Sequence, residues 1–301
     1  MSEIIASPST RRLARDHGVD IDALAHKLGR TTIGPEDIEA DESDSSGSTG
    51  AEATAHPGDT SYWDVDHARF GPVTEEPLSR FAQIASANLM AANTLIPQVT
   101  HHDRAEVTAL ERLRAQWKAE AGQRGLRLTA LAFHVAALAR TLRAFPRFNA
   151  SLDPDGRMLI LKDYVHIGIA VDTPHGLMVP VIRDADRKGL WQIAAEIADL
   201  ADRAVRRKVK PDEMGGASMS ISNLGGIGGI GFTPIVNPPE VAILGITRTE
   251  TITLWDGDTP RPVQMVPLDL SYDHRVINGA DAARFLSHYA GLIADPRRML
   301  V

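Results

Sequence analysis

The sequence predicts an α/β fold in which a mixed sheet is covered by helices, preceded by a small all-α module. After residue 62, apolar residues recur at helical spacing in four segments, while five others show the alternating or continuous apolar pattern of strands. The two kinds are interleaved without a strict strand–helix–strand rhythm, which favours a mixed sheet over a doubly wound one. An acidic stretch rich in Ser, Gly and Thr predicts a flexible linker over 41–61, between a module at 7–40 and one continuous domain at 62–301.

Composition excludes several classes of protein. The 301 residues carry a formal net charge of −7, which argues against a general nucleic-acid binder. The absence of cysteine excludes disulfides, thiolate nucleophiles and Cys-ligated metals, and it fits a cytoplasmic location. No apolar run approaches the ~20 residues of a membrane span, and Met1 to Ser9 lacks the pattern of a signal peptide. We therefore expect neither a nucleic-acid partner nor a membrane.

Three short helices are expected in the module. TRRLARDHG predicts a helix closed by Gly18, IDALAHKLG a second closed by Gly29, and IGPEDIEA a third with Pro35 in its first turn. Domains below ~40 residues usually need a disulfide or a metal, so composition alone leaves open a tail without fixed structure. The only candidates for a core are Leu13, Val19, Ile21, Leu24, Leu28, Ile33 and Ile38.

The larger domain has helices predicted over 78–92, 128–145, 190–207 and 279–293, and strands over 164–171, 177–182, 217–222, 240–246 and 262–273. Pro146 ends the second of these helices. The first helix places Leu78, Phe81, Ala85, Leu89 and Ala92 on one face. The last helix places Ala282, Phe285, Leu286, Tyr289, Leu292 and Ile293 on one face.

Two motifs resemble known sites but lack the required context. GIGGIG at 226–231 matches a dinucleotide-binding pattern, but FTPIVNPPE follows, and its three prolines prevent the helix that the motif needs. The adjacent His101 and His102 would point apart on a strand, and His134 within an apolar helix is interpreted as a core or interface histidine. We therefore expect no dinucleotide site and no metal site.

Two segments could carry chemistry. In 271–279, polar groups crowd a reversal between a strand and a helix, and His274 there could act as a general base near neutral pH. The alternative is structural, with Asn278 as the N-cap of the last helix. In 218–225, a serine hydroxyl at a strand end beside a glycine loop could donate to an oxyanion, or it could only form a turn.

At these residues the chain resembles a known family. DHRVINGADAARF resembles the H-x-x-x-D-G active-site motif of the dihydrolipoamide acyltransferases, the E2 components of 2-oxoacid dehydrogenase complexes, which is shared with chloramphenicol acetyltransferases. PLSRFAQIASANL, FPRFNASLD, IGIAVDTPHGLMVPVIRDADRKGL and SISNLGGIGGIGFTPIVNPPEVAILGI also resemble E2 segments, in family order, so the likeness covers about residues 70–301. The glycine-rich segment looks most like the acetyltransferases of bacterial pyruvate dehydrogenase. The resemblance implies a fold like that of chloramphenicol acetyltransferase.

The resemblance also implies an activity and its residues. His274 matches the general base that takes the proton from the thiol of coenzyme A, and Ser222 matches the hydroxyl that stabilises the oxyanion, with no acyl-enzyme. Asn278 stands where the motif has Asp, and it can cap a helix equally well. The family's site lies between two subunits of a homotrimer, and the trimers build a larger core, commonly a 24-subunit cube.

The N-terminal segment ASPSTRRLARDHGVDIDALAHKLGRTTIGPEDIEA resembles the peripheral subunit-binding domain of E2 chains, which holds acidic patches on E1 or E3. By position, Arg11, Arg12 and Arg15 match its basic helix. None of the six lysines lies in a lipoyl-type DKA context, so we expect the lipoyl group to be supplied by another domain or protein.

Two alternatives remain beside an acetyltransferase of this kind. The chain could be a non-catalytic E2-like scaffold that assembles the complex and recruits E1 or E3. A small-molecule acetyltransferase of the chloramphenicol type is a more distant alternative, because it would have no use for a subunit-binding module.

Overall fold

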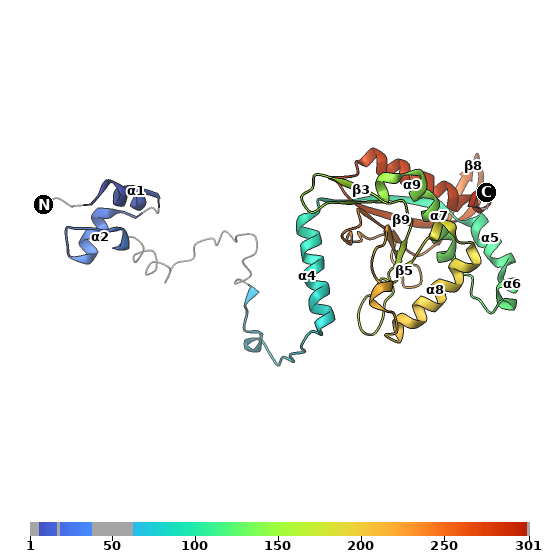
Figure 1. Cartoon of the computed structure of the whole chain (residues 1–301), viewed down its shortest axis with the longest axis horizontal. Helices are drawn as coiled ribbons and strands as arrows, with labels where there is room; N and C mark the ends of the chain where they lie inside the picture. Colours follow the sequence, from blue (N-terminus) through green and yellow to red (C-terminus); the bar gives the residue numbers. More distant parts are fainter. Residues whose placement is uncertain (1–5, 17–18, 38–62, 300–301) are drawn as a thin grey trace. The chain divides into compact units, whose positions relative to one another are not determined.

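The computed structural model describes residues 6–16, 19–37 and 63–299 and divides into two compact units, Met1–Glu75 and Glu76–Val301 (Figure 1). The predicted linker at 41–61 lies outside the described residues. Each unit is described by itself.

The N-terminal unit contains helices α1 (Pro8–Asp16) and α2 (Ile21–Leu28) and a short 3-10 helix, η2 (His67–Arg69). The Asp20 side chain caps the start of α2, and Gly29 ends it with φ 65°, as its position in the sequence predicts. Of the third expected helix, residues 35–37 are helical and 33–34 are not, while residues 38–40 and Gly18 lie outside the described residues.

A small core supports the helices of the N-terminal unit. It consists of Ala14, Leu24, Ala25 and Ile33, with Ala6, Leu13, Val19 and Ile21 packed against it. The expectation for Leu28 was wrong: its side chain is 41% exposed, because the helix ends there and Gly29 turns the chain away. Ile38 lies outside the described residues. The buried core favours a folded module over a tail.

The second unit is built on a mixed sheet. Its strand order is β1-β9-β7-β6-β4-β5, with β8 paired to β9, and β6 runs parallel to β4 and β7 whereas the other pairs are antiparallel. The strands are β1 (Gln98–Glu106), β4 (Ile167–Ile169), β5 (Val181–Ile182), β6 (Met219–Asn223), β7 (Ala242–Ile246), β8 (Glu250–Asp256) and β9 (Thr259–Asp273). A separate hairpin pairs β2 (Ala150–Leu152) with β3 (Leu159–Leu161). The predicted fold class, a mixed-sheet α/β domain after a small all-α module, is confirmed.

The helices of this unit are α4 (Arg80–Leu95), α5 (Thr108–Gln116), α6 (Lys118–Gln123), α7 (Ala130–Ala144), α8 (Leu190–Val205) and α9 (Gly279–Ala294). Helix α4 lies at one side of the unit and α5 and α6 at the opposite side (Figure 1). Short 3-10 helices complete the unit: η3 (Pro146–Phe148), η4 (Ala185–Arg187), η5 (Pro211–Glu213) and η6 (Pro296–Met299).

The two faces of β9 differ in chemistry. Leu268, Leu270 and Tyr272 join the main core with apolar residues of α7, α8 and α9. The alternate residues, Asp269 and Ser271, belong to the other face because successive side chains of a strand alternate. That polar face is where the candidate site residues of the sheet lie.

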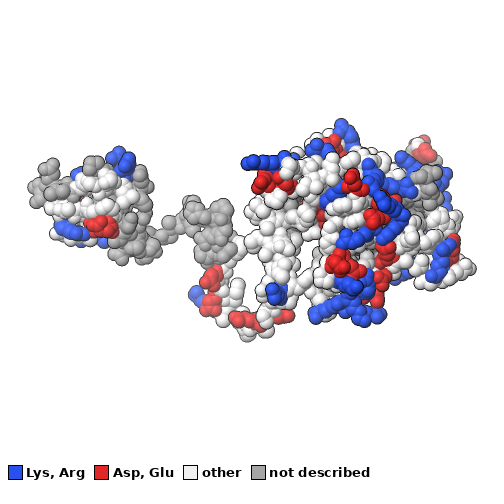
Figure 2. Space-filling model, viewed as in Figure 1, with Lys and Arg blue, Asp and Glu red and all other residues white. Residues whose placement is uncertain are grey.

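Helix α4 forms where a helix is expected, but its apolar face is not packed within one chain. Only Ala92 of the predicted face is buried, while Leu78, Phe81 and Leu89 are 63%, 43% and 49% exposed. Figure 2 shows the helix almost free of charged side chains. Exposed large apolar side chains gathered on one helix are typical of an interaction surface.

Candidate active site

Three serines near β6 differ in their hydrogen bonding. Ser218 Oγ donates to the carbonyl oxygen of Tyr164 at 3.3 Å, and Ser220 Oγ donates to Glu240 Oε1 at 2.9 Å. The half-buried Ser222 hydroxyl has no hydrogen-bond partner among the described residues. A structural role therefore accounts for Ser218 and Ser220 and leaves Ser222 available to a ligand.

The glycine-rich segment after Ser222 forms tight turns. The N–H groups of Ile227 and Gly228 both donate back to the Leu224 carbonyl. Gly228 and Gly229 adopt φ values of 150° and 88°, which glycine reaches without strain. Residues 230–239 contain no helix, so this segment lacks the helix N-terminus that a dinucleotide site requires.

A cavity of about 380 Å³ adjoins this loop. Its lining includes Asn223 and Gly225, next to Ser222, together with Arg114 and Arg248. Each of the two guanidinium groups also pairs with a nearby carboxylate. The cavity therefore offers two cationic groups and polar backbone beside the Ser222 strand end.

His274 follows the last residue of β9, and its neighbours hold it in place. The Asp273 carboxylate is buried and accepts hydrogen bonds from the Arg275 backbone and guanidinium, the closest at 2.7 Å. The His274 N–H donates to the Pro97 carbonyl at 3.1 Å. Its imidazole is exposed, lies 5.9 Å from the Tyr272 ring and has no hydrogen-bond partner within 6–16, 19–37 and 63–299. The ring is therefore accessible on a fixed backbone.

Asn278 is the N-cap of α9. Its φ and ψ of −92° and 165° are extended, and its Oδ1 accepts a hydrogen bond from the Asp281 N–H at 2.9 Å. This geometry supports the capping interpretation, and it places the N-cap of α9 four residues after His274.

One chain does not bring Ser222 and His274 together. Ser222 pairs with Gly245, which in turn pairs with Asp269 of β9. His274 lies five residues beyond Asp269, roughly 16 Å away along the strand direction. The two groups are thus at opposite ends of β7, and a site that uses both needs two chains.

Sequence reasoning missed Glu240, a buried carboxyl group just before β7. It is 4% exposed, and its Oε1 accepts from Ser220 Oγ at 2.9 Å and from Asn237 Nδ2 at 3.0 Å. Burial raises the pKa of Glu240 to about 7. It lines a cavity of about 400 Å³ that also includes Asp273 and Arg275, the neighbours of His274. In the sequence, a glutamate after two prolines and directly before a strongly apolar strand could have pointed to Glu240.

The remaining predictions for histidines hold. His134 is 3% exposed and is hydrogen-bonded through Nδ1 to the Tyr289 hydroxyl, and burial lowers its pKa to about 4, so it is a core histidine. His101 pairs with Leu270 and His102 with Asp269, so the two side chains belong to opposite faces of β1.

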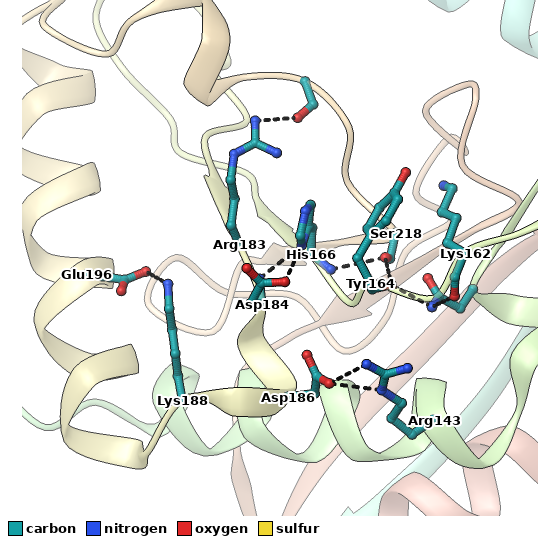
Figure 3. A network of polar contacts seen from close by, with 12 residues as sticks. Arg143, Lys162, Tyr164, His166, Arg183, Asp184, Asp186, Lys188, Glu196 and Ser218 are labelled. Atoms are coloured by element: carbon teal, nitrogen blue, oxygen red, sulfur yellow. Dashed lines mark hydrogen bonds and ion pairs between the residues drawn. The ribbon is translucent and has the colours of Figure 1, made fainter.

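His166 belongs to a separate polar network that the sequence did not identify (Figure 3). Its Nδ1 accepts the Asp184 N–H at 2.9 Å, and its ring lies 4.4 Å from the Tyr164 ring. The Asp184 backbone has φ 46°. Burial lowers the pKa of His166. These contacts tie the start of β4 to the segment after β5.

Within the described residues, no group of three or more His, Asp or Glu side chains could hold a metal ion. None of the helices in the same residues is long and apolar enough to cross a membrane.

The basic residues of the module lie on α1. Arg11, Arg12 and Arg15 are exposed, and Figure 2 shows cationic side chains on the surface of this unit. Arg30 instead forms an ion pair with Asp37, whose other oxygen accepts the Gly34 N–H at 2.9 Å. Arg30 therefore stabilises the module internally.

Comparisons with known proteins match this arrangement. The chain is 46% identical over 303 residues to the dihydrolipoyllysine-residue acetyltransferase component of the pyruvate dehydrogenase complex of Pseudomonas aeruginosa, covering 100% of this chain and 55% of the relative. It is 45% identical to the component of the same name from Azotobacter vinelandii, covering 100% and 48%. The chain thus spans about half the length of these curated relatives.

Solved structures of dihydrolipoamide acetyltransferases are similar to this chain as well. An Azotobacter vinelandii dihydrolipoamide acetyltransferase, studied for the role of a serine, a histidine and an asparagine in its catalytic mechanism, is 50% identical with a TM-score of 0.77 and covers 79% of this chain and 98% of its own. The cubic core of a pyruvate dehydrogenase multienzyme complex gives the same identity, TM-score and coverage.

Family models cover both units. An E3 binding domain matches residues 4–32, and the catalytic domain of the 2-oxoacid dehydrogenase acyltransferases matches residues 70–301. With most of its length matched in this way, the chain belongs to the 2-oxoacid dehydrogenase acyltransferase family.

Proposed function

We propose that this chain transfers an acetyl group between dihydrolipoamide and coenzyme A, as the E2 core of a pyruvate dehydrogenase-type complex. One observation carries the assignment. In the Azotobacter vinelandii acetyltransferase, the serine and histidine studied for catalysis are 52 positions apart, and the asparagine follows the histidine by four. Ser222, His274 and Asn278 have the same spacing.

The exposed imidazole of His274 acts as the general base. It removes the proton from the thiol of coenzyme A, and the thiolate attacks the thioester carbonyl carbon of acetyl-dihydrolipoamide. The tetrahedral oxyanion accepts a hydrogen bond from Ser222 Oγ, which has no competing partner among the described residues. The intermediate expels the dihydrolipoamide sulfur, which takes the proton from the imidazolium. The acetyl group thus passes directly from sulfur to sulfur.

The positions of the two groups support a site between subunits. Because Ser222 and His274 lie at opposite ends of β7, we propose that His274 of one copy meets Ser222 of another in a homotrimer. The likeness to a cubic core supports assembly of such trimers into a larger particle, which we propose to be a 24-mer.

The cavity beside Ser222 is our candidate for the coenzyme A side. Arg114 and Arg248 line it with Asn223 and Gly225, and guanidinium groups suit a phosphate-bearing thiol. No metal is needed for this transfer. The lipoyl group is supplied by another domain or by another protein acting in trans.

The module at 7–40 recruits the partner enzymes in this proposal. The match to an E3 binding domain and the exposed arginines of α1, Arg11, Arg12 and Arg15, support binding to acidic surfaces of E3, E1 or both.

The rival function is a non-catalytic scaffold, and one assay separates the two. The purified chain is mixed with free dihydrolipoamide and acetyl-coenzyme A, and acetyl-dihydrolipoamide is measured. We expect turnover that depends on His274. A correctly assembled chain without turnover would favour the scaffold.

A further inference from the structure

A buried carboxylate lies in the same row of the sheet as Ser222. Asp269 of β9 is 2% exposed, and across the sheet the row reads His102, Asp269, Gly245 and Ser222. Residues directly opposite each other on paired strands share a face, so these positions belong to the polar face of the sheet.

Both carboxylate oxygens of Asp269 are used. His102 Nδ1–H donates to Oδ1 at 2.6 Å, and the Phe232 N–H donates to Oδ2 at 3.1 Å. His102 is the one side chain in the described residues that forms a hydrogen bond with Asp269. A buried carboxylate needs such partners because leaving it unpaired is strongly unfavourable.

These bonds fix the far end of the glycine-rich loop. The loop, residues 224–232, begins where the Leu224 N–H donates to the Ile246 carbonyl and ends at Phe232. The Phe232 ring lies against Gly245, where a Cβ would come within 2.8 Å of the ring. The loop therefore starts beside Ser222, crosses Gly245 and ends on Asp269.

We propose that His102 and Asp269 are positioning residues for acetyl transfer: together they hold loop 224–232 against the sheet, and so shape the cavity beside Ser222. The inference rests on the proposed function only for its kinetic readout. Neither residue touches the reacting atoms. Their effect passes through Phe232 to the loop that carries Gly225 and Gly226, which line the cavity.

The first test is kinetic. His102→Leu removes the donor from a side chain that is 56% exposed, so the fold should tolerate it. His102→Asn keeps an N–H donor close to the position of Nδ1. We expect His102→Leu to raise the KM for coenzyme A about tenfold, the effect of losing one charge-assisted hydrogen bond. The KM for dihydrolipoamide should not change, and His102→Asn should restore most of the loss.

The matched control is His101→Leu, on the same strand but on the opposite face. It should leave both KM values unchanged. If His102→Leu behaves like this control, or if it lowers kcat and both KM values change together, the positioning role is wrong.

The second test needs no activity. Amide hydrogen exchange of peptides covering 224–232 is compared in the assembled full chain of wild type, His102→Leu and His101→Leu. We expect faster exchange in this loop for His102→Leu alone. Equal exchange in all three would overturn the inference. Faster loop exchange in a chain that catalyses no transfer would keep the inference on loop fastening and overturn the proposed function instead.

Discussion

Ser222 lies in the same row of the sheet as Asp269 of β9, whereas His274 follows the last residue of that strand, five residues further along the chain. No rotation of either side chain can close this separation, since strand pairing sets it. Assemblies that mix chains lacking His274 with chains lacking Ser222 can therefore distinguish a site within one chain from a site between chains.

The first prediction is complementation. His274→Ala should lower turnover by roughly 10²–10⁴, the usual range for a general base. Assemblies formed from equal amounts of His274→Ala and Ser222→Ala chains should recover about a quarter of wild-type activity, because about a quarter of the interfaces join two intact groups. Activity is measured after co-expression or joint refolding. No recovery in a mixed particle shown to contain both chains would argue for a site within one chain.

The second prediction separates catalysis from binding at Ser222. Ser222→Ala should lower kcat by about 10²–10³, as expected when an oxyanion donor is lost. KM should change little, because the hydroxyl acts on charge that develops in the transition state. Ser220→Ala is the control, since its hydroxyl binds Glu240. A Ser222→Ala enzyme with raised KM and normal kcat would instead indicate uniform substrate binding.

The third prediction concerns Asn278. Asn278→Ala removes the bond to the Asp281 N–H and should cost about 1 kcal/mol of stability. It should also lower kcat, because the loop that carries His274 is fixed at that cap. Asn278→Asp keeps the cap, so its thermal midpoint and kcat should stay close to wild type. A folded Asp variant with a strongly altered rate would show that charge matters more than capping.

The fourth prediction concerns pH and Glu240. Its folded pKa of about 7 lies above the ordinary value of 4.5 because of burial. As pH rises from 4.5 to 7, the Glu240 carboxyl ionises in the unfolded chain before it does in the folded one. The free energy of unfolding therefore falls over this range, by about 3 kcal/mol in total. Glu240→Gln keeps an acceptor for Ser220 and removes this loss. Between pH 5 and pH 8, the denaturation midpoint of wild type should therefore fall more than that of Glu240→Gln. The exposed Glu76→Gln is the control, and parallel pH profiles for Glu240→Gln and wild type would contradict the prediction.

The fifth prediction concerns the basic helix of the module. Charge reversal at Arg12 and Arg15 should weaken association with E3 or E1 and flatten its dependence on salt, because oppositely charged surfaces accelerate encounter. Surface plasmon resonance at several salt concentrations gives the rates. Arg157→Glu, on the other unit, is the control, and all variants should transfer acetyl groups to free dihydrolipoamide normally. If the charge-reversed variants of Arg12 and Arg15 associated as fast as wild type, other residues would carry the recruitment of E3 or E1.

Local patterns predicted local structure well. All six apolar residues expected on the face of α9 are buried, and Asn278 caps it. β1 was not predicted as a full strand, because QVTHHDRAE contains few large apolar residues and gains its order from pairing with β9. β4 is shorter than the predicted 164–171 because its pairing with β5 and β6 covers only a few residues.

Contacts distant in sequence were harder to foresee. Glu240 with Ser220 and His102 with Asp269 are brought together by strand order and register, which no local periodicity specifies. The sequence identified the Ser222 and His274 segments. Their placement at opposite ends of β7 depends on the parallel pairing of β6 with β7 and the antiparallel pairing of β9 with β7, which the sequence does not specify.

The uncovered side of α4 bears on the life of each chain before assembly. In a single chain, four large apolar side chains are exposed on or beside this helix: Leu78, Phe81, Leu89 and Leu95. A newly made subunit in that state is the form most prone to aggregate. In the proposed trimer, rapid association with another copy of the chain would shorten the time spent in that state. In the proposed assembly, chains at low concentration would therefore aggregate most, and the rate at which subunits meet would help to determine the yield of assembled particles.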